Sequence, residues 1–189
     1  MANIRIDDFK AKLKGGGARP NMFEVEIAVG NSRSDPTKVV ELGKFLVKAA
    51  SLPASVIAPV VVQFRGRQVQ LAGDKTFEPW TITIINDTTM ELRNAFEAWS
   101  NYIENNQSNE GVANPADYKV DMAVYQLDQK GQRVKGYKLV GTWPSNVSAI
   151  DLSFDNENTV EEFTVELQVD YWLATGVEGQ TSGLVLRNA

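Results

Sequence analysis

Residues 64–104 carry the most informative pattern in the chain, FRGRQVQLAGDKTFEPWTITIINDTTMELRNAFEAWSNYIE. An Arg-Gly-Arg start and a Gly-Asp turn lead into a strand at 80–85, in which apolar and polar side chains alternate. A helix is predicted directly after it, because Thr88 and Glu91 have capping-box spacing ahead of an amphipathic run. The apolar face of that helix is formed by Leu92, Ala95, Phe96, Trp99 and Ile103.

The two-residue period of half-buried strands dominates the rest of the chain. It recurs at 23–29, 118–127, 134–143 and 163–171. Gly131 lies in the turn of a predicted hairpin between the second and third of these strands. Pro144 is predicted to end the strand that precedes it, since proline donates no hydrogen bond to a sheet. The pattern predicts a mainly antiparallel β-sandwich or β-barrel with one flanking α-helix.

Composition narrows the classes of function. At 189 residues the chain fits one domain with a normal core. It contains no cysteine and no histidine, which removes disulfides, histidine-based catalytic triads and most zinc sites. We expect no catalytic residue, no metal and no cofactor. No apolar run approaches the roughly 20 residues that span a bilayer, and the N-terminus lacks a signal-peptide pattern, so synthesis in the cytoplasm is expected.

Charge is concentrated at the two ends of the sequence. Residues 1–20 contain five bases and two acids, and residues 151–189 contain eight acids and one arginine. The acidic end is a poor ligand for nucleic-acid phosphates, because like charges repel.

Three groups of residues are candidates for function. The first is the glycine-rich segment with Gly15, Gly16, Gly17, Arg19 and Pro20. It lacks the Gly-Lys-Ser/Thr ending of a phosphate-binding loop, and it indicates a flexible hinge before the first strand. Likewise Asp155–Asn158 lacks the glycine and glutamate of a calcium loop, and it indicates a turn.

The second group lies in 38–72, which we predict to be an extended arm. Its exposed apolar candidates include Val56, Ile57 and Val61, and such residues usually need a partner surface. Arg65 and Arg67, two apart, are predicted on one face of the extended arm, where they would form salt bridges to another subunit or a solvated face.

The third group is the polar face of the predicted strand 163–171, with its acids Glu162, Glu166 and Asp170. On the residues alone, this is the ordinary solvent face of a half-buried strand. The opposite face is predicted to be core and consists of Phe163, Val165, Leu167, Val169 and Tyr171.

The order of elements in 64–104, together with GGGARPN at 15–21, resembles the tail tube proteins of contractile-tailed (T4-like) bacteriophages. The resemblance implies a fold related to the type VI secretion tube protein and a structural, non-enzymatic role. Such proteins form hexameric rings that stack into a tube inside a contractile sheath. The implied partners are further copies of the chain, the sheath, the baseplate with its tube initiator, and the tail terminator. The implied location is the virion tail, where DNA passes through the lumen without specific binding.

The resemblance also implies a role for each candidate group. A single tube domain would span 1–173, with 1–20 as an arm between subunits and 38–72 as a ring-stacking arm. Either the acidic strand at 162–170 or the strand at 80–85 would face the lumen. Residues 174–189 would be a C-terminal extension. Three alternatives remain: a tube of a headless injection system (a tailocin or type VI-like apparatus), a baseplate tube initiator, and a carbohydrate-binding β-sandwich. Genomic neighbours, copy number in particles and glycan binding would separate them.

Overall fold

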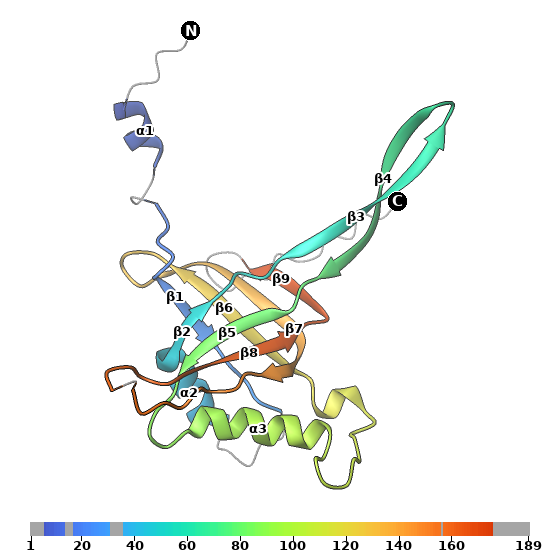
Figure 1. Cartoon of the computed structure of the whole chain (residues 1–189). Coiled ribbons are helices and arrows are strands. Elements are labelled where there is room, and N and C mark those ends of the chain that lie inside the picture. The colour runs from blue at the N-terminus through green and yellow to red at the C-terminus, as the bar shows by residue number, and fades with distance from the viewer. Residues whose placement is uncertain (1–5, 14–16, 31–35, 156, 176–189) are drawn as a thin grey trace.

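The structure is a computed structural model that describes residues 6–13, 17–30, 36–155 and 157–175. Figure 1 shows a β-rich body with helix α3 (Glu91–Ile103) on one side and two arms that extend from the other side. One arm is helix α1 (Ile6–Lys12), and the other is the hairpin of β3 (Ser55–Phe64) and β4 (Arg67–Phe77). The predicted fold class, a mainly antiparallel sandwich or barrel with a flanking helix, is confirmed.

The body is a seven-stranded sheet within the described residues, in the order β1-β6-β7-β8-β5-β2, and β9 pairs with β7 off this path. All of these pairings are antiparallel. The strands are β1 (Phe23–Glu26), β2 (Val47–Ala50), β5 (Trp80–Ile85), β6 (Val120–Leu127), β7 (Arg133–Val147), β8 (Glu162–Gln168) and β9 (Tyr171–Thr175). A short 3-10 helix, η2 (Pro115–Asp117), precedes β6.

Strand β7 joins the two halves of the body. Its first part pairs with β6 and β9, and its last part pairs with β8. Gly141 lies two residues before the pairing with β8 begins, with a φ of 68°, a left-handed value that favours glycine. The prediction that Pro144 ends the strand is wrong: Pro144 pairs with Leu167 next to a register shift, and such irregularities are where a sheet accepts proline.

The core lies between the strands and α3. Its largest fully buried side chains are Trp80, Trp99, Phe96 and Phe163. Both tryptophans have their polar atom satisfied: Trp80 Nε1 donates to the Ser51 carbonyl at 2.6 Å, and Trp99 Nε1 donates to the Tyr118 carbonyl at 2.9 Å. The helix face predicted from sequence is the face that is buried, with Ile103 partly so.

The start of α3 differs from the predicted capping box. The residue before the helix is Met90 at φ 52°, and no side chain caps the helix from that position. Asp87 Oδ1 instead accepts a hydrogen bond from the Glu91 backbone nitrogen at 3.4 Å. Thr88 lies inside the turn that precedes the helix, which is closed by the Met90 backbone nitrogen donating to the Asp87 carbonyl at 3.1 Å.

A second helix, α2 (Pro36–Leu46), occupies part of the segment predicted to be an extended arm, 38–72. Val39 on this helix is fully buried, and Leu42 and Leu46 pack against the core. A Cβ at Gly43 would lie 3.2 Å from Ile27 side-chain atoms, so glycine lets the helix approach β1 closely. The protruding arm is therefore shorter than predicted at its start, since 36–50 is part of the body.

The predicted strand 163–171 is divided. β8 ends at Gln168, the Asp170 backbone nitrogen donates to the Val140 carbonyl at 3.1 Å, and Tyr171 begins β9. Phe163, Val165 and Leu167 are buried as predicted, but Tyr171 is 43% exposed. Its assignment to the core is wrong because the chain reverses before it, which ends the alternation of β8.

Candidate assembly surface

The β3–β4 hairpin projects from the body with one register shift, between Ile57 and Pro59. The ten residues of β3 make an arm about 33 Å long at about 3.3 Å per residue. A two-stranded ribbon without a covering layer is marginally stable in water. The hairpin is consequently a part of the chain that needs a partner surface.

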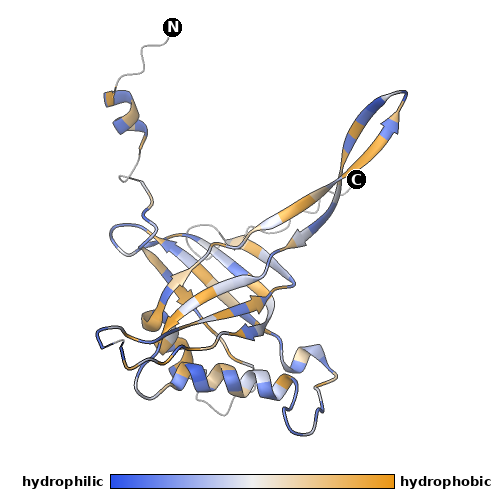
Figure 2. Cartoon of the chain, viewed as in Figure 1, coloured by the Kyte–Doolittle hydropathy of each residue, from blue (hydrophilic) through white to orange (hydrophobic). Residues whose placement is uncertain are grey.

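The register divides the outer hairpin into two faces, since residues directly opposite each other share a face. One face, here called the apolar hairpin face, consists of Val60, Val62, Phe64, Val69 and Leu71. All five side chains are 44–62% exposed in the single chain. Figure 2 shows the hydrophobic colour along much of β3. A row of this kind on a protruding element is typical of a surface that is covered on assembly.

The opposite face is more polar, because it pairs Val61 with Gln70 and Gln63 with Gln68. Sequence reasoning selected Val61 as a stacking residue, and the structure places it on this polar face. Val56 and Ile57, also selected, are exposed at the base of the hairpin. The apolar hairpin face was missed because a run of three valines hides the alternation.

The tip of the hairpin is a tight turn at Arg65 and Gly66, which have φ values of 46° and 80°. Two positive φ values are typical of the turns that join antiparallel strands with two residues. Arg65 and Arg67 therefore do not share one face of a continuous extended segment, as the sequence had suggested. Arg65 lies 5.4 Å from the Phe64 ring centroid, and neither arginine forms an ion pair with another described residue.

Contacts at the base fix the hairpin to the body. Trp172 of β9 donates from Nε1 to the Ala54 carbonyl at 3.1 Å and meets the Phe77 ring edge-on at 6.2 Å. Lys75 lies over both rings, 5.2 Å from each centroid. At the register shift, a Cβ on Gly73 would lie 2.6 Å from the Ala58 carbonyl oxygen, so a side chain does not fit there. The hairpin thus leaves the body in a defined direction.

The N-terminal arm carries a second exposed apolar row. Ile6, Phe9 and Leu13, spaced by three and four residues, are all exposed. After Gly17, at φ 84°, the Arg19 carbonyl accepts a hydrogen bond from Gln126 Nε2 at 2.8 Å, so the chain is attached to the body from there. Pro20 is exposed. Gly15 and Gly16 lie outside the described residues, and the hinge remains a prediction.

The three acids predicted to share one strand do not. Glu162 and Glu166 are on β8, whereas Asp170 lies in the turn that follows it. Two of them are neutralised: Lys48 Nζ is 2.5 Å from Glu162, and Lys119 Nζ is 2.7 Å from Asp170. Glu166 lies opposite Thr81 of β5 and has no ion pair with another described residue. The acidity of this face therefore rests mainly on Glu166.

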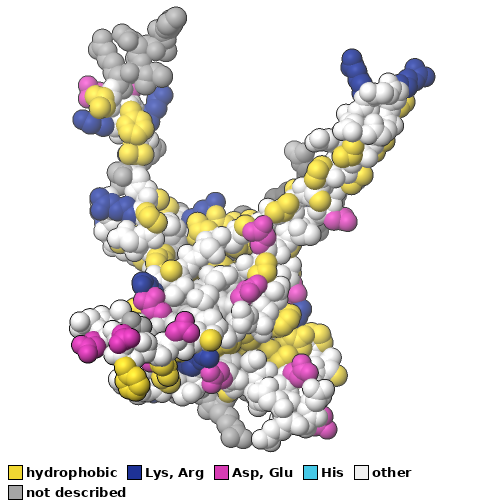
Figure 3. All heavy atoms as spheres, viewed as in Figure 1, with side chains coloured by type: hydrophobic (Ala, Val, Ile, Leu, Met, Phe, Trp, Pro, Cys, Tyr) yellow, Lys and Arg dark blue, Asp and Glu magenta, His cyan; other side chains and the backbone are white. Residues whose placement is uncertain are grey.

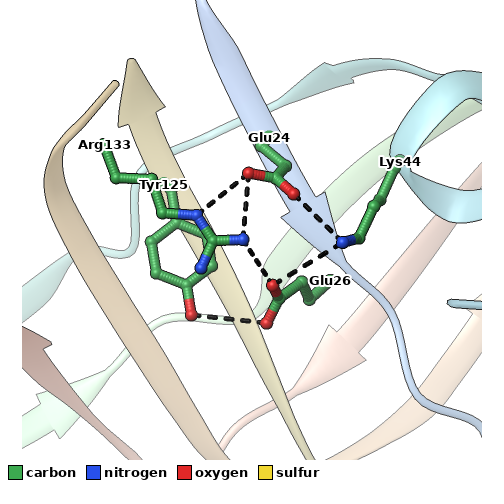
Figure 4. Close-up of polar contacts among 5 residues, drawn as sticks. All are labelled: Glu24, Glu26, Lys44, Tyr125 and Arg133. Carbon is green, nitrogen blue, oxygen red and sulfur yellow. Dashed lines mark hydrogen bonds and ion pairs between the residues drawn. The ribbon is translucent and has the colours of Figure 1, made fainter. Parts of the chain in front are cut away.

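A network of charged side chains lies on the outer surface of β1, β6 and β7 (Figure 4). Arg133 Nη2 lies 2.6 Å from Glu26 and 3.0 Å from Glu24, and its guanidinium carbon is 3.8 Å from the Tyr125 ring centroid. Lys44 of α2 lies 3.2 Å from Glu24. Each charge is paired within the network. The arrangement therefore favours a structural role, in which the network holds α2 against β1, β6 and β7.

We expect Arg133→Ala to lower the free energy of unfolding by about 1–2 kcal/mol, because exposed ion pairs contribute about 1 kcal/mol or less and the ring contact adds a similar amount. Urea unfolding at pH 7 measures this. Arg133→Lys is the matched control, because it keeps the positive charge but cannot contact Glu24 and Glu26 with a guanidinium group. Its free energy of unfolding should lie between those of the wild type and Arg133→Ala. An unchanged stability of Arg133→Ala would contradict the structural role.

The same network has a pH signature. Hydrogen bonding from Arg133 lowers the pKa of Glu24, and burial opposes this effect. A carboxylate with a lowered pKa stabilises the fold above its ordinary value of 4.5 and loses that contribution as pH falls towards its folded value. The free energy of unfolding should therefore decline below about pH 4.5 less steeply in Glu24→Gln than in the wild type.

The described part of the chain contains no group of three or more acidic side chains suited to a metal ion. None of the helices described is long and apolar enough to cross a membrane.

Comparison with known proteins places the chain in a family. A family model described as phage tail tube protein matches residues 18–175. The chain is 35% identical over 171 residues to tail tube protein gp19 of Enterobacteria phage T4, covering 88% of this chain and 98% of that protein. It is 28% identical over 167 residues to the tail tube protein of Serratia phage KSP90, covering 86% and 93%.

Solved structures share its fold. A chain of the PVC sheath–tube complex, from an extracellular contractile injection system in the extended state, matches with a TM-score of 0.58 at 14% identity, covering 93% of this chain and 100% of that one. A chain of the anti-feeding prophage baseplate matches with a TM-score of 0.60 at 14% identity, covering 85% and 97%. At these identities the likeness concerns the fold alone.

The structure defines a class of fold: a β-rich body with a flanking helix and two arms that carry exposed apolar side chains. Within that class, the chain belongs to the phage tail tube protein family. The family suggested by 64–104 and 15–21 is thereby confirmed.

Proposed function

We propose that the chain forms the inner tube of a contractile phage tail, as hexameric rings that stack and conduct the genome into the host. The apolar hairpin face carries this proposal, because five exposed apolar side chains on a projecting ribbon are unfavourable in a monomer and favourable in a stack. Membership of the tail tube family supports it.

The role is structural and requires no chemical step. The partners are further copies of the chain, the sheath around the tube, the baseplate with its initiator at one end and a terminator at the other. Sheath–tube and baseplate assemblies are the settings of the two solved structures that share the fold. The protein would be located in the virion tail after synthesis in the host cytoplasm.

Three surfaces have distinct roles under this proposal. The hairpin and residues 1–20 contact neighbouring copies, and the outer face of β5 and β8 lines the lumen. That lumen wall would be rich in threonine, with Glu166 as its uncompensated acid, so it would repel DNA weakly and bind none of it specifically. The residues after 175 lie outside the described part of the chain, and their proposed role is a C-terminal extension.

Electron microscopy of the purified protein in a concentration series tests the proposal. Rings with a central hole, or stacked tubes, are expected, and a map with resolved side chains should place Glu166 on the bore. Addition of baseplate complexes as seeds is the control for slow initiation. A monomer at every concentration, even with seeds, would refute the tube, and Glu166 buried between subunits would refute the lumen assignment.

The tube of a headless contractile injection system is a second candidate. The fold shared with the PVC sheath–tube complex supports it, at 14% identity. The 35% identity to a phage protein favours a genome-carrying particle, and DNA in purified particles would distinguish the two.

A further inference from the structure

The loop between β7 and β8 has an unusual surface. Leu152, Phe154 and Val160 are 80%, 104% and 67% exposed, so Phe154 has no cover from the rest of the chain. Single exposed apolar residues are normal on a soluble protein, but three on one loop indicate a contact surface. Neither the predicted lumen nor the arms account for this loop.

The same loop is acidic. Asp151, Asp155, Glu157 and Glu161 flank the apolar residues, and none of them forms an ion pair with another described residue. Among these four acids, Glu161 accepts a side-chain hydrogen bond within the described part of the chain, from Asn86 Nδ2 at 3.3 Å. The surface that fits this loop is therefore apolar with a basic margin.

The hairpin has that chemistry. Its apolar face ends at Arg65 and Arg67, which have no acidic partner among the described residues. Figure 3 shows basic side chains at the hairpin tip and acidic ones mostly on the body. In Figure 1 the hairpin and the β7–β8 loop extend from opposite sides of the body, so the two surfaces of one chain do not meet.

We propose that the apolar hairpin face of one copy packs on Leu152 and Phe154 in the β7–β8 loop of another copy. This rests on the proposed tube function and names the surface that receives the arm. A contact between two different patches on opposite sides of a subunit leaves a free patch at each end, so it propagates along a stack. Arg65 and Arg67 would approach the acids of the loop and orient the contact, which long-range charge attraction favours at low salt.

Cross-linking tests the contact with little interference, because the chain contains no cysteine. The full-length double variant Val62→Cys/Phe154→Cys is assembled under reducing conditions and then oxidised. Each chain then carries one thiol on the arm and one on the loop, so a non-reducing gel should show a ladder of multimers. Val61→Cys/Phe154→Cys, with the thiol on the polar hairpin face, is the matched control and should give about tenfold less ladder, since disulfides form only between closely opposed residues.

The outcomes separate this contact from the tube itself. Tubes in the microscope without a ladder, or equal ladders from both variants, would overturn the contact and leave the tube standing. Failure of the wild type to assemble with baseplate seeds would instead overturn the tube. If the reduced Val62→Cys/Phe154→Cys variant fails to assemble while the wild type assembles, the loop thiol is moved to Leu152. The contact then requires a ladder from Val62→Cys/Leu152→Cys. The control Val61→Cys/Leu152→Cys should give none.

Discussion

Val62→Asp is expected to abolish tube formation while leaving a folded monomer. Val62 is 44% exposed in the single chain, so a carboxylate there remains solvated and costs the monomer little. In a stack the same side chain would be covered, and burying an unpaired charge costs several kcal/mol. A loss of about 3 kcal/mol per contact corresponds to roughly a hundredfold rise in the concentration needed for assembly. Sedimentation across a concentration series measures this, and thermal unfolding checks the fold.

Val61→Asp is the control for Val62→Asp. It introduces the same charge one residue away, on the face where Gln70 is its cross-strand partner. Because a one-residue step reverses the face of a strand, its effect should be much smaller. Equal effects of the two variants would show that assembly does not distinguish the two faces of the hairpin. Normal tubes from Val62→Asp would show that the hairpin is not part of the interface.

Trp99→Ala is expected to lower the free energy of unfolding by about 3–5 kcal/mol, the range for removing a large buried aromatic side chain. Trp99 is fully buried between α3 and the sheet, and its Nε1 satisfies the Tyr118 carbonyl. The ring also lies against Gly30, where a Cβ would be 2.6 Å from Nε1. Chemical denaturation of the monomeric Val62→Asp background would measure the loss without interference from assembly.

Two variants dissect the Trp99 effect. Trp99→Phe keeps most of the packing and loses the hydrogen bond, so it should cost less than Trp99→Ala. Ser100→Ala changes an exposed position on the same helix and should lie within about 0.5 kcal/mol of the wild type. A cost for Trp99→Ala near that of Ser100→Ala would contradict the central place of this ring in the core.

The periodic parts of the fold could be predicted from the sequence because their side chains report local geometry. The alternation at 80–85 matches β5 residue for residue, and the apolar stripe of 92–103 marks the buried face of α3. The predicted hairpin around Gly131 is also present, as β6 and β7. The family was recognisable from the same stretch, since the order of strand, turn and helix is a property of the chain alone.

Contacts between distant residues were decided only by the tertiary structure. Pro144 lies within a strand because Gly141 bends β7 and a register shift against β8 accommodates the ring. Two of the three predicted acids are paired with lysines, Lys48 and Lys119, that are far away in the sequence. No local pattern contains that information, because each pairing depends on how separate strands meet.

The hairpin illustrates the division most clearly. By itself the sequence determined that the arm is apolar, with three adjacent valines that suit an extended chain and a glycine that permits a turn. Alternation along a strand already separates Val60 and Val62 from Val61. Only the tertiary structure decided which residues of β4 join each face, because the turn at Arg65 and Gly66 sets the register and the register pairs Val62 with Val69 but Val61 with Gln70. The physical reason is that alternation is a property of a single strand, whereas a face made by two strands exists only after they are aligned.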